Sequence, residues 1–315
     1  LSNYGYNVSV VDNYFRRNIS KSKNIGSLFE NPSLVDRAKE WKKLTNKNID
    51  VAIGDLTNFD FMFGVINKTA NFELKSKENS DIPDTIIHFA EQPSAPFSMI
   101  DHNKSNFTLT NNIITTNNLI NSIKKINKDI HIIKLGTMGE YGTPNIDIEE
   151  GWIEITHNER KQNFLFPRQA SSIYHTSKIM DTDLLWFAVR TWGIKVTDLM
   201  QGPVYGIFTK ETALSDNLKT IFNYDEIFGT VINRFITQAC IDYPLTIYGK
   251  GNQVRGYINI KDSLKCIKLS IDNPPAKSDL RIFNQISETL SVQKIADKIK
   301  NACKTINKTI NIKYY

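Results

Sequence analysis

The sequence predicts an α/β protein with a doubly wound parallel sheet and a smaller C-terminal domain. Apolar, strand-like runs at 8–12, 49–55, 85–92, 131–135 and 195–200 alternate with helical patterns at 34–44, 105–126 and 171–191. This alternation is typical of parallel strands joined by helices. The first two runs each end in an acid, Asp12 and Asp55. Because ligands bind at the carboxyl ends of strands in open α/β sheets, a ligand site is expected there.

The N-terminal elements resemble part of a Rossmann-type dinucleotide-binding unit. In such a unit a glycine-rich loop lies between the first strand and its helix, and an acid ends the second strand about 20 residues later. Here Asp12 is present, no glycine-rich loop precedes it, and residue 1 is not Met. We therefore expect a chain that lacks the first strand and the phosphate loop. The alternative is that Asp12 only caps a turn.

Two domains are expected, at 1–200 and 201–315, with some later segments returning to the first. A helix-like pattern at 225–242 and strand-like runs at 245–248 and near 255–260 indicate the smaller domain. The region 144–167 has charges, aromatics and no clear periodicity. Such a long connection predicts a functional lid.

Composition narrows the class of protein. The hydrophobic fraction is 40%, which is ordinary for a soluble globular protein. No apolar run reaches the length of a membrane span, and no signal peptide is recognisable. The three cysteines are widely separated and match no metal or redox spacing. The net charge of +6 comes from dispersed lysines rather than a basic block, so we expect no nucleic-acid partner. From the lengths of the apolar runs and the spacing of the cysteines, we also expect no membrane and no metal.

Two motifs predict proton transfer to and from an alcohol. The strand at 131–135 leads to a hydroxyl, Thr137, and a carboxylate, Glu140, in a glycine-rich turn. Tyr174 and Lys178, four residues apart, share one face of a helix. A Tyr phenol titrates near pH ~10, and a nearby ammonium would lower its pKa. The spacing alone is weak evidence, since Tyr257 and Lys261 have it too in a strand-like stretch.

The order of these motifs resembles the extended short-chain dehydrogenase/reductase superfamily and, within it, the UDP-sulfoquinovose synthase family. The resemblance rests on the 18-residue block at 134–151 (KLGTMGEYGTPNIDIEEG) and on QASSIYHTSK at 169–178. FGTVINRF at 228–235, PLTIYGKG at 244–251 and FNQ at 283–285 add to it. It extends over nearly the whole chain, and the long block is far more specific than the four-residue spacings.

The resemblance implies an NAD-dependent enzyme that acts on UDP-glucose and sulfite. Bound NAD would oxidise C4 of the glucose, loss of the C5 proton and the C6 hydroxyl would give an enone, and sulfite would add at C6. By position, Tyr174 would be the base at the C4 hydroxyl, and Lys178 would lower its pKa and hold the nicotinamide ribose. Thr137 would hydrogen-bond the reacting oxygen. Glu140 would take the C5 proton, which requires a raised pKa.

The resemblance also implies the binding residues. The cofactor would lie against Asp12, Asn13, Arg16, Arg17, Asp55, Leu56, Phe89, Ala90, Asn112, Tyr174, Lys178 and Gln201. The UDP-sugar would lie against Gln92, Met138, His175, Gln201, Thr246, Ile247, Tyr248 and Arg255, with the guanidinium on the diphosphate. A simpler alternative exists for several of these. Glu140 could cap a turn, His175 could be packing, Thr246 and Tyr248 could be ordinary strand residues, and Arg16 and Arg17 could be surface charge. Relatives also imply a homodimer, a sulfite-delivering protein as a possible partner, and a soluble enzyme of the plastid stroma or the cytoplasm.

Three departures from the family pattern qualify this expectation. Without the phosphate loop, the chain alone is expected to bind NAD weakly or not at all. Pro93 stands where the family has Arg in its Glu-Gln-Arg-Ser-Ala-Pro stretch, which puts anion binding in doubt. The chain also stops soon after Cys303, short of the family's usual end.

Other functions stay open at this point. A 4-epimerase needs only oxidation and re-reduction at C4, but gives no reason for the insertion at 144–167. A 4,6-dehydratase is less expected because Met138 and Gly139 stand where those enzymes have Asp and Glu. A non-catalytic nucleotide- or RNA-binding remnant is the alternative from another class.

Overall fold

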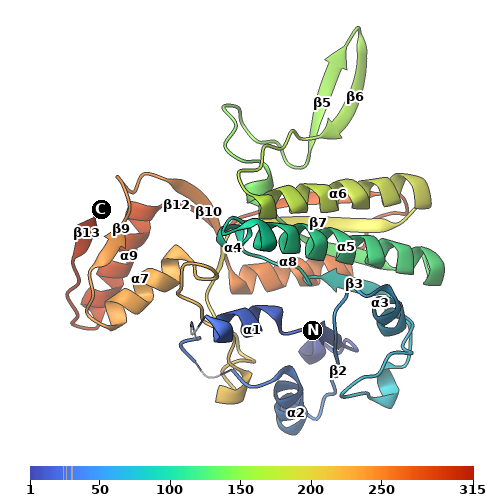
Figure 1. The fold of residues 1–315 in the computed structure, drawn as a ribbon, viewed down its shortest axis with the longest axis horizontal. Coiled ribbons are helices and arrows are strands. Elements are labelled where there is room, and N and C mark those ends of the chain that lie inside the picture. The colour runs from blue at the N-terminus through green and yellow to red at the C-terminus, as the bar shows by residue number, and fades with distance from the viewer. Residues whose placement is uncertain (24, 26, 30) are drawn as a thin grey trace.

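Four parallel strands form the main sheet of the computed structural model, which describes residues 1–23, 25, 27–29 and 31–315. The strand order is β11-β7-β4-β3, with bounds β3 Thr85–His88, β4 His131–Thr137, β7 Lys195–Gln201 and β11 Leu280–Gln285. Ile132 pairs with Val196, which pairs with Leu280 on its other side. The predicted doubly wound parallel architecture is confirmed (Figure 1).

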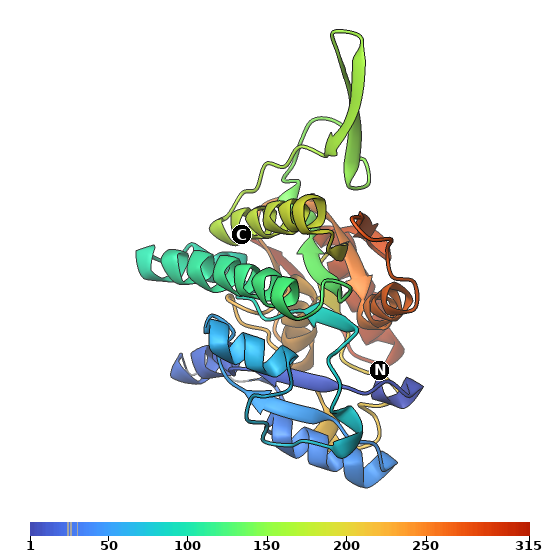
Figure 2. The same ribbon diagram turned by 90° about the vertical axis from the view of Figure 1, so that its right-hand side faces the viewer.

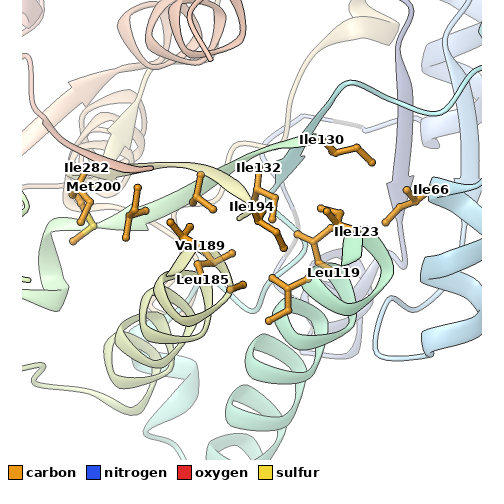
Figure 3. Close-up of a cluster of buried hydrophobic side chains, with 14 of the residues drawn as sticks. Ile66, Leu119, Ile123, Ile130, Ile132, Leu185, Val189, Ile194, Met200 and Ile282 are labelled. Carbon is orange, nitrogen blue, oxygen red and sulfur yellow. The ribbon is translucent and has the colours of Figure 1, made fainter. Parts of the chain in front are cut away.

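Helices cover both faces of this sheet. Ile132, Val196 and Met200 face helices α5 (His102–Ile126) and α6 (Ile173–Trp192), where Leu119 and Leu185 are also buried (Figure 3). The alternate residues Ile133 and Leu199 face α8 (Ile260–Asp272). Strands buried on both faces read as continuous apolar runs, which is why periodicity located them.

Local signals set the ends of the two long helices. The Asp101 side chain accepts a hydrogen bond from the Lys104 amide at the start of α5, and Ser172 does the same for α6 from the His175 amide. Gly193, at φ +74°, ends α6. None of the helices in the described ranges is long and apolar enough to cross a membrane.

The N-terminal elements form a second parallel pair, β1 (Ser9–Asp12) with β2 (Asp50–Ile53). Asp12 ends its strand as predicted, whereas β2 stops two residues before Asp55. The first residues contain a 3₁₀ turn, η1. The short elements here are η1 Ser2–Tyr4, α1 Phe15–Ser22, α2 Leu34–Thr45, α3 Phe59–Ile66, η2 Lys77–Asn79 and α4 Ala95–Ser98.

A second, smaller core lies in the C-terminal part. Phe235, Leu245, Ile247 and Ile295 are buried there between helices and short strands. The strand orders are β12-β10-β8 and β13-β9. The elements are β8 Val204–Tyr205, η4 Asp216–Leu218, α7 Val231–Cys240, β9 Leu245–Ile247, β10 Val254–Asn259, β12 Glu288–Ser291, α9 Val292–Thr305 and β13 Ile312–Tyr314. The boundary at residue 200 stays a prediction.

The region expected to be a lid contains a β-hairpin, and its function as a lid stays a prediction. Strands β5 (Trp152–His157) and β6 (Arg160–Leu165) pair antiparallel and project away from the body (Figures 1 and 2). The base is anchored by an edge-to-face contact between Trp152 and Trp186, whose ring centroids are 5.0 Å apart. Both faces of this ribbon are largely exposed, so its alternating side chains do not produce an apolar–polar period in the sequence.

His88, at the end of β3, yields a pH-dependent prediction. Burial lowers its pKa to about 4, although nearby Glu91 acts in the opposite direction. The unfolded chain, with a His pKa near ~6.5, then binds the proton first as pH falls. The contribution of neutral, buried His88 to the free energy of unfolding is fully present above pH ~6.5. It falls by on the order of 3 kcal/mol as the pH falls toward 4.

We expect the free energy of unfolding of His88→Gln to fall less steeply than that of the wild type across this window. Urea unfolding at a series of pH values measures both slopes. Parallel curves would show that His88 is not buried in its neutral form.

Candidate active site

Thr137 closes β4 and opens a short 3₁₀ turn, η3 (Met138–Glu140). Its hydroxyl accepts a hydrogen bond from the Gly139 amide at 3.2 Å, and the Glu140 carboxylate accepts one from the Thr137 amide at 3.3 Å. This reciprocal capping box fixes the turn. The Thr137 hydroxyl proton is not used in the turn, so it can be donated to a ligand oxygen.

Helix α6 presents Tyr174 and Lys178 within its first turns. The Tyr174 amide donates to the Ser98 hydroxyl at 3.1 Å, which ties α6 to α4. Ser177 donates to the Tyr174 carbonyl and accepts from the Asn112 side chain at 2.9 Å. The predicted helix and shared face are thus present, and they are held by buried hydrogen bonds from two neighbouring helices.

Lys178 faces two carboxylates in this arrangement. Its ammonium forms an ion pair with Glu91 and lies 3.8 Å from Asp181 Oδ2, and these anions raise its pKa. Burial, followed by the charges of Glu91 and Glu140, raises the pKa of Tyr174 well above its ordinary value. The net effect of burial and these carboxylates is thus to disfavour the phenolate, and the expectation that Lys178 lowers the Tyr174 pKa stays a prediction.

A second buried charge cluster lies behind Thr137. The Lys134 ammonium is 3.3 Å from Glu140 Oε1 and 3.2 Å from Asp198 Oδ2, and it donates to the Lys178 carbonyl at 3.0 Å. Arg168 contacts the other Glu140 oxygen at 2.9 Å. Lys134, Glu140 and Asp198 are fully buried.

This cluster bears on the role predicted for Glu140, which stays a prediction. Burial raises the pKa of its carboxyl, as a base would require, but the group has no exposed surface. Both of its oxygens are bound by cations on the core side of the turn. The simpler reading, that Glu140 caps the turn, agrees with this geometry.

His175 and Met138 flank the same turn. A Cβ at residue 139 would approach His175 Nε2 to 2.2 Å, so only glycine fits there. His175 Nδ1 lies 2.9 Å from the Ser172 hydroxyl. Burial, with Arg255 adding to it, lowers the pKa of His175 to about 4, so the ring is neutral at pH 7. Met138 is partly buried against the main core. The electrostatic effect of Arg255 on His175 indicates that the C-terminal part reaches this turn.

Several predicted cofactor residues remain open to a ligand. Asp12 is exposed at the end of β1, and its Oδ1 accepts from the Tyr14 amide at 2.6 Å. Asn13 accepts from the Phe15 amide at 2.9 Å. Phe89 is 49% exposed just past β3, beside Ala90. Asp55 forms a tight turn with Thr57, and the neighbouring Leu56 packs against the main core.

Arg16 and Arg17 are engaged within the protein. Arg16 donates to the Asn223 side chain at 2.7 Å and lies over the Phe228 ring. Arg17 donates to the Pro32 carbonyl at 2.9 Å and lies over Tyr14. Both guanidinium groups anchor neighbouring segments, and their predicted contact with the adenosine end of NAD stays a prediction.

Three predicted contact residues are buried positioning groups. Asn112 and Gln92 have no exposed surface, and the Asn112 side chain accepts from the Gln92 amide at 2.7 Å. Gln201 donates to the Gln285 side chain at 2.9 Å and accepts from Ser263 at 2.9 Å. Their amide groups are bonded to protein atoms, so direct cofactor or sugar contact is not supported.

In the C-terminal part, the predicted UDP residues divide into two groups. Thr246 and Ile247 are buried, and Thr246 accepts from Gln238 at 2.7 Å. Tyr248 is 64% exposed, and Arg255 is also exposed. The sequence reading missed Arg234, whose guanidinium lies 5.5 Å from the Tyr248 ring centroid.

Two cavities lie elsewhere. One of about 680 Å³ is lined by Phe29, Asp36, Lys39 and Asp216, beside α2. One of about 380 Å³ is lined by Tyr6, Asp84, His131 and Lys195, at the amino ends of the strands. Among the described residues, no group of three His, Cys, Asp or Glu side chains is placed to hold a metal ion.

The parallel main sheet, covered by helices on both faces, is a Rossmann-type α/β fold. The model of the NAD dependent epimerase/dehydratase family matches residues 33–284, and the chain belongs to that family.

Two relatives carry a more particular name. UDP-sulfoquinovose synthase of spinach, described as chloroplastic, is 45% identical over 302 residues, which are 96% of this chain and 60% of the relative. UDP-sulfoquinovose synthase of Sulfolobus acidocaldarius is 39% identical over 316 residues, 100% of this chain and 77% of the relative. The chain thus spans about three fifths to three quarters of their lengths.

Solved structures share the fold at lower identity. UDP-glucose 4-epimerase of Bifidobacterium longum, in complex with NAD⁺ and UDP, is 21% identical with a TM-score of 0.68, over 99% of this chain and 80% of that one. The Thermotoga maritima UDP-glucose 4-epimerase with UDP-glucose is 17% identical with a TM-score of 0.67, over 99% and 79%.

The residues present fit NAD, the cofactor of this family. The exposed Asp12 carboxylate ends a strand, where ribose hydroxyls are bound in such folds. Glu91 Oε1 is buried with no hydrogen-bond partner beside Lys178. An unpaired buried acceptor of this kind suits a hydroxyl donor.

The buried cluster yields a prediction on stability. Lys134→Met leaves Glu140 and Asp198 buried without their shared cation, so we expect a loss of about 3–5 kcal/mol in the free energy of unfolding. Lys161→Met is the matched control, because Lys161 pairs with Glu154 on the exposed hairpin. It should cost less than about 1 kcal/mol. Equal losses in urea unfolding would contradict the role given to the cluster.

Proposed function

We propose that the full-length protein is a UDP-sulfoquinovose synthase. It converts UDP-glucose and sulfite to UDP-sulfoquinovose through a 4-keto-5-ene intermediate, with tightly bound NAD. The observation that carries this proposal is the 39–45% identity, over at least 96% of the chain, to two relatives of that name. Thr137 at the end of β4 and Tyr174 with Lys178 on α6 add support, since they offer a hydroxyl, a phenol and an ammonium to one alcohol.

In this proposal, three residues handle the proton of the C4 hydroxyl. Tyr174 accepts it as general base and later returns it. Thr137 donates its free hydroxyl proton to the same oxygen. Lys178 stabilises the phenolate once a ligand changes its pairing with Glu91. When bound, NAD would accept the C4 hydride and give it back.

Other groups would bind and orient the substrate. Arg255 and Tyr248, both exposed in the C-terminal part, suit a diphosphate and a uracil ring. Met138 and the neutral His175 ring would border the sugar. Asp12 would bind the adenosine ribose. Glu140 supports Thr137 from beneath the turn, and its role as the base for the C5 proton stays a prediction.

The same proposal includes sulfite as a substrate, a homodimeric assembly and a sulfite-delivering protein. It also includes a location in the plastid stroma or cytoplasm. One observation supports the homodimer. The exposed Phe107 and Ile114 lie two turns apart on α5, and Met180 and Phe187 are spaced likewise on the adjacent α6. Two such helices present an apolar surface that a second copy could cover.

The test is to incubate the full-length gene product with UDP-glucose, NAD and sulfite. Mass spectrometry should detect a UDP-sugar in which a sulfonate replaces a hydroxyl. Tyr174→Phe should lower the rate at least ~100-fold, the usual scale of a lost general base. Tyr257→Phe is the matched control, since Tyr257 has the same spacing to Lys261 but lies buried in β10. It should retain activity.

Other outcomes would replace the proposal. If UDP-galactose alone forms, the protein is a 4-epimerase. Absence of turnover despite tight NAD binding would indicate a binding function.

A further inference from the structure

The Glu91 carboxylate is the main partner of the Lys178 ammonium. Glu91 lies just after β3, so the ion pair joins that loop to α6. The two side chains are 5% and 2% exposed. Asp181 faces Lys178 from one helical turn further along α6, at 3.8 Å and with no exposed surface. Lys178 is therefore held between two carboxylates, of which Glu91 is the closer.

Among the described residues, Lys178 is the only Lys or Arg that forms an ion pair with the Glu91 carboxylate. Its second oxygen, Oε1, is buried without a hydrogen-bond partner. The nearest other candidate cation is His88, 3.6 Å away. Burial lowers the pKa of His88 to about 4, so this ring is neutral at pH 7. The neutral His88 ring therefore does not compensate the charge of Glu91.

Tyr174 lies within the field of this pair. The charged groups that act on it come from several neighbouring elements: Glu91 from the loop after β3, Lys134 from β4, Glu140 from η3 and Asp181 from α6 itself. Lys178 lies on the same helix, four residues after Tyr174. Among the charges, Glu91 raises the pKa of Tyr174 most, ahead of Glu140, while Lys134 lowers it. The Glu91 charge therefore disfavours the Tyr174 phenolate, whereas the Lys178 charge that Glu91 holds would favour it.

We propose that Glu91 is a positioning residue of this active site, which fixes the Lys178 ammonium by an ion pair and thereby sets the charge that Tyr174 faces. The inference rests on the proposed function, in which Tyr174 takes the C4 proton. Glu91 acts through Lys178 and Tyr174 and needs no contact with the sugar.

The substitution Glu91→Gln tests the charge while keeping the shape and one carbonyl acceptor for Lys178. In the NAD-loaded full-length protein, reduction of the bound cofactor by UDP-glucose is followed by NADH absorbance across pH. We expect the acidic limb of this profile to move to lower pH by on the order of 1 unit, the scale of one nearby charge. Glu159→Gln, at the exposed tip of the hairpin, is the control and should leave the limb in place.

A merely structural role for Glu91 would lower the melting temperature and leave the acidic limb unmoved, and that result would overturn the proposal. A second measurement does not depend on activity. In a double-mutant cycle, Lys178→Met should lower the melting temperature less in the Glu91→Gln background than in the wild type. Additive losses would show that the pair is not coupled. If the wild type does not reduce its NAD at any pH, the proposed function fails, while the cycle still tests the ion pair.

Discussion

The buried ammonium of Lys134 is the constraint on which the geometry of the site depends. It lies inside a strand with no exposed surface, and its Cα partner on β7 is Asp198. Once buried, this charge requires partners on every side. It takes them from β7, from the turn after β4 through Glu140, and from the carbonyl of Lys178 on α6. The turn that carries Thr137 and the helix that carries Tyr174 are therefore fixed to one atom.

The second ion pair, Glu91 with Lys178, is linked to the first cluster through Lys178. Lys178 contributes its carbonyl to Lys134 and its ammonium to Glu91, so the same residue links both groups of charges. Burial and the charges of Glu91 and Glu140 both raise the pKa of Tyr174, whereas Lys134 lowers it. The arrangement favours a protonated Tyr174. In the proposed function, Tyr174 would therefore act as a base only when a ligand alters these charges, because a phenolate beside uncompensated carboxylates is unfavourable.

Periodicity predicted the fold well because the main strands are buried on both faces and the long helices carry clear caps, such as Asp101 and Ser172. It did not predict α8, although Asn259 caps it and Ile260, Leu264, Ile267 and Ile271 mark one helical face. Which side of a turn a side chain occupies is a tertiary property. Arg16 and Glu140 therefore had plausible ligand positions in the sequence but bind protein groups in the fold. The buried cluster did leave a signal, since Lys134 and Asp198 are charges within apolar strands.

The hairpin β5–β6 also depends on the Lys134 cluster. Arg168 follows β6 directly and inserts its guanidinium against Glu140, while Phe166 packs edge-to-face on Tyr141. The base of the insertion is thus part of the core that supports Thr137, even though the strands themselves project outward (Figure 2). Arg168 Nε and Nη2 are buried without hydrogen-bond partners, so this anchor carries a desolvation cost. The ion pair with Glu140 and the packing of Phe166 on Tyr141 must offset that cost to hold the base of the hairpin in place.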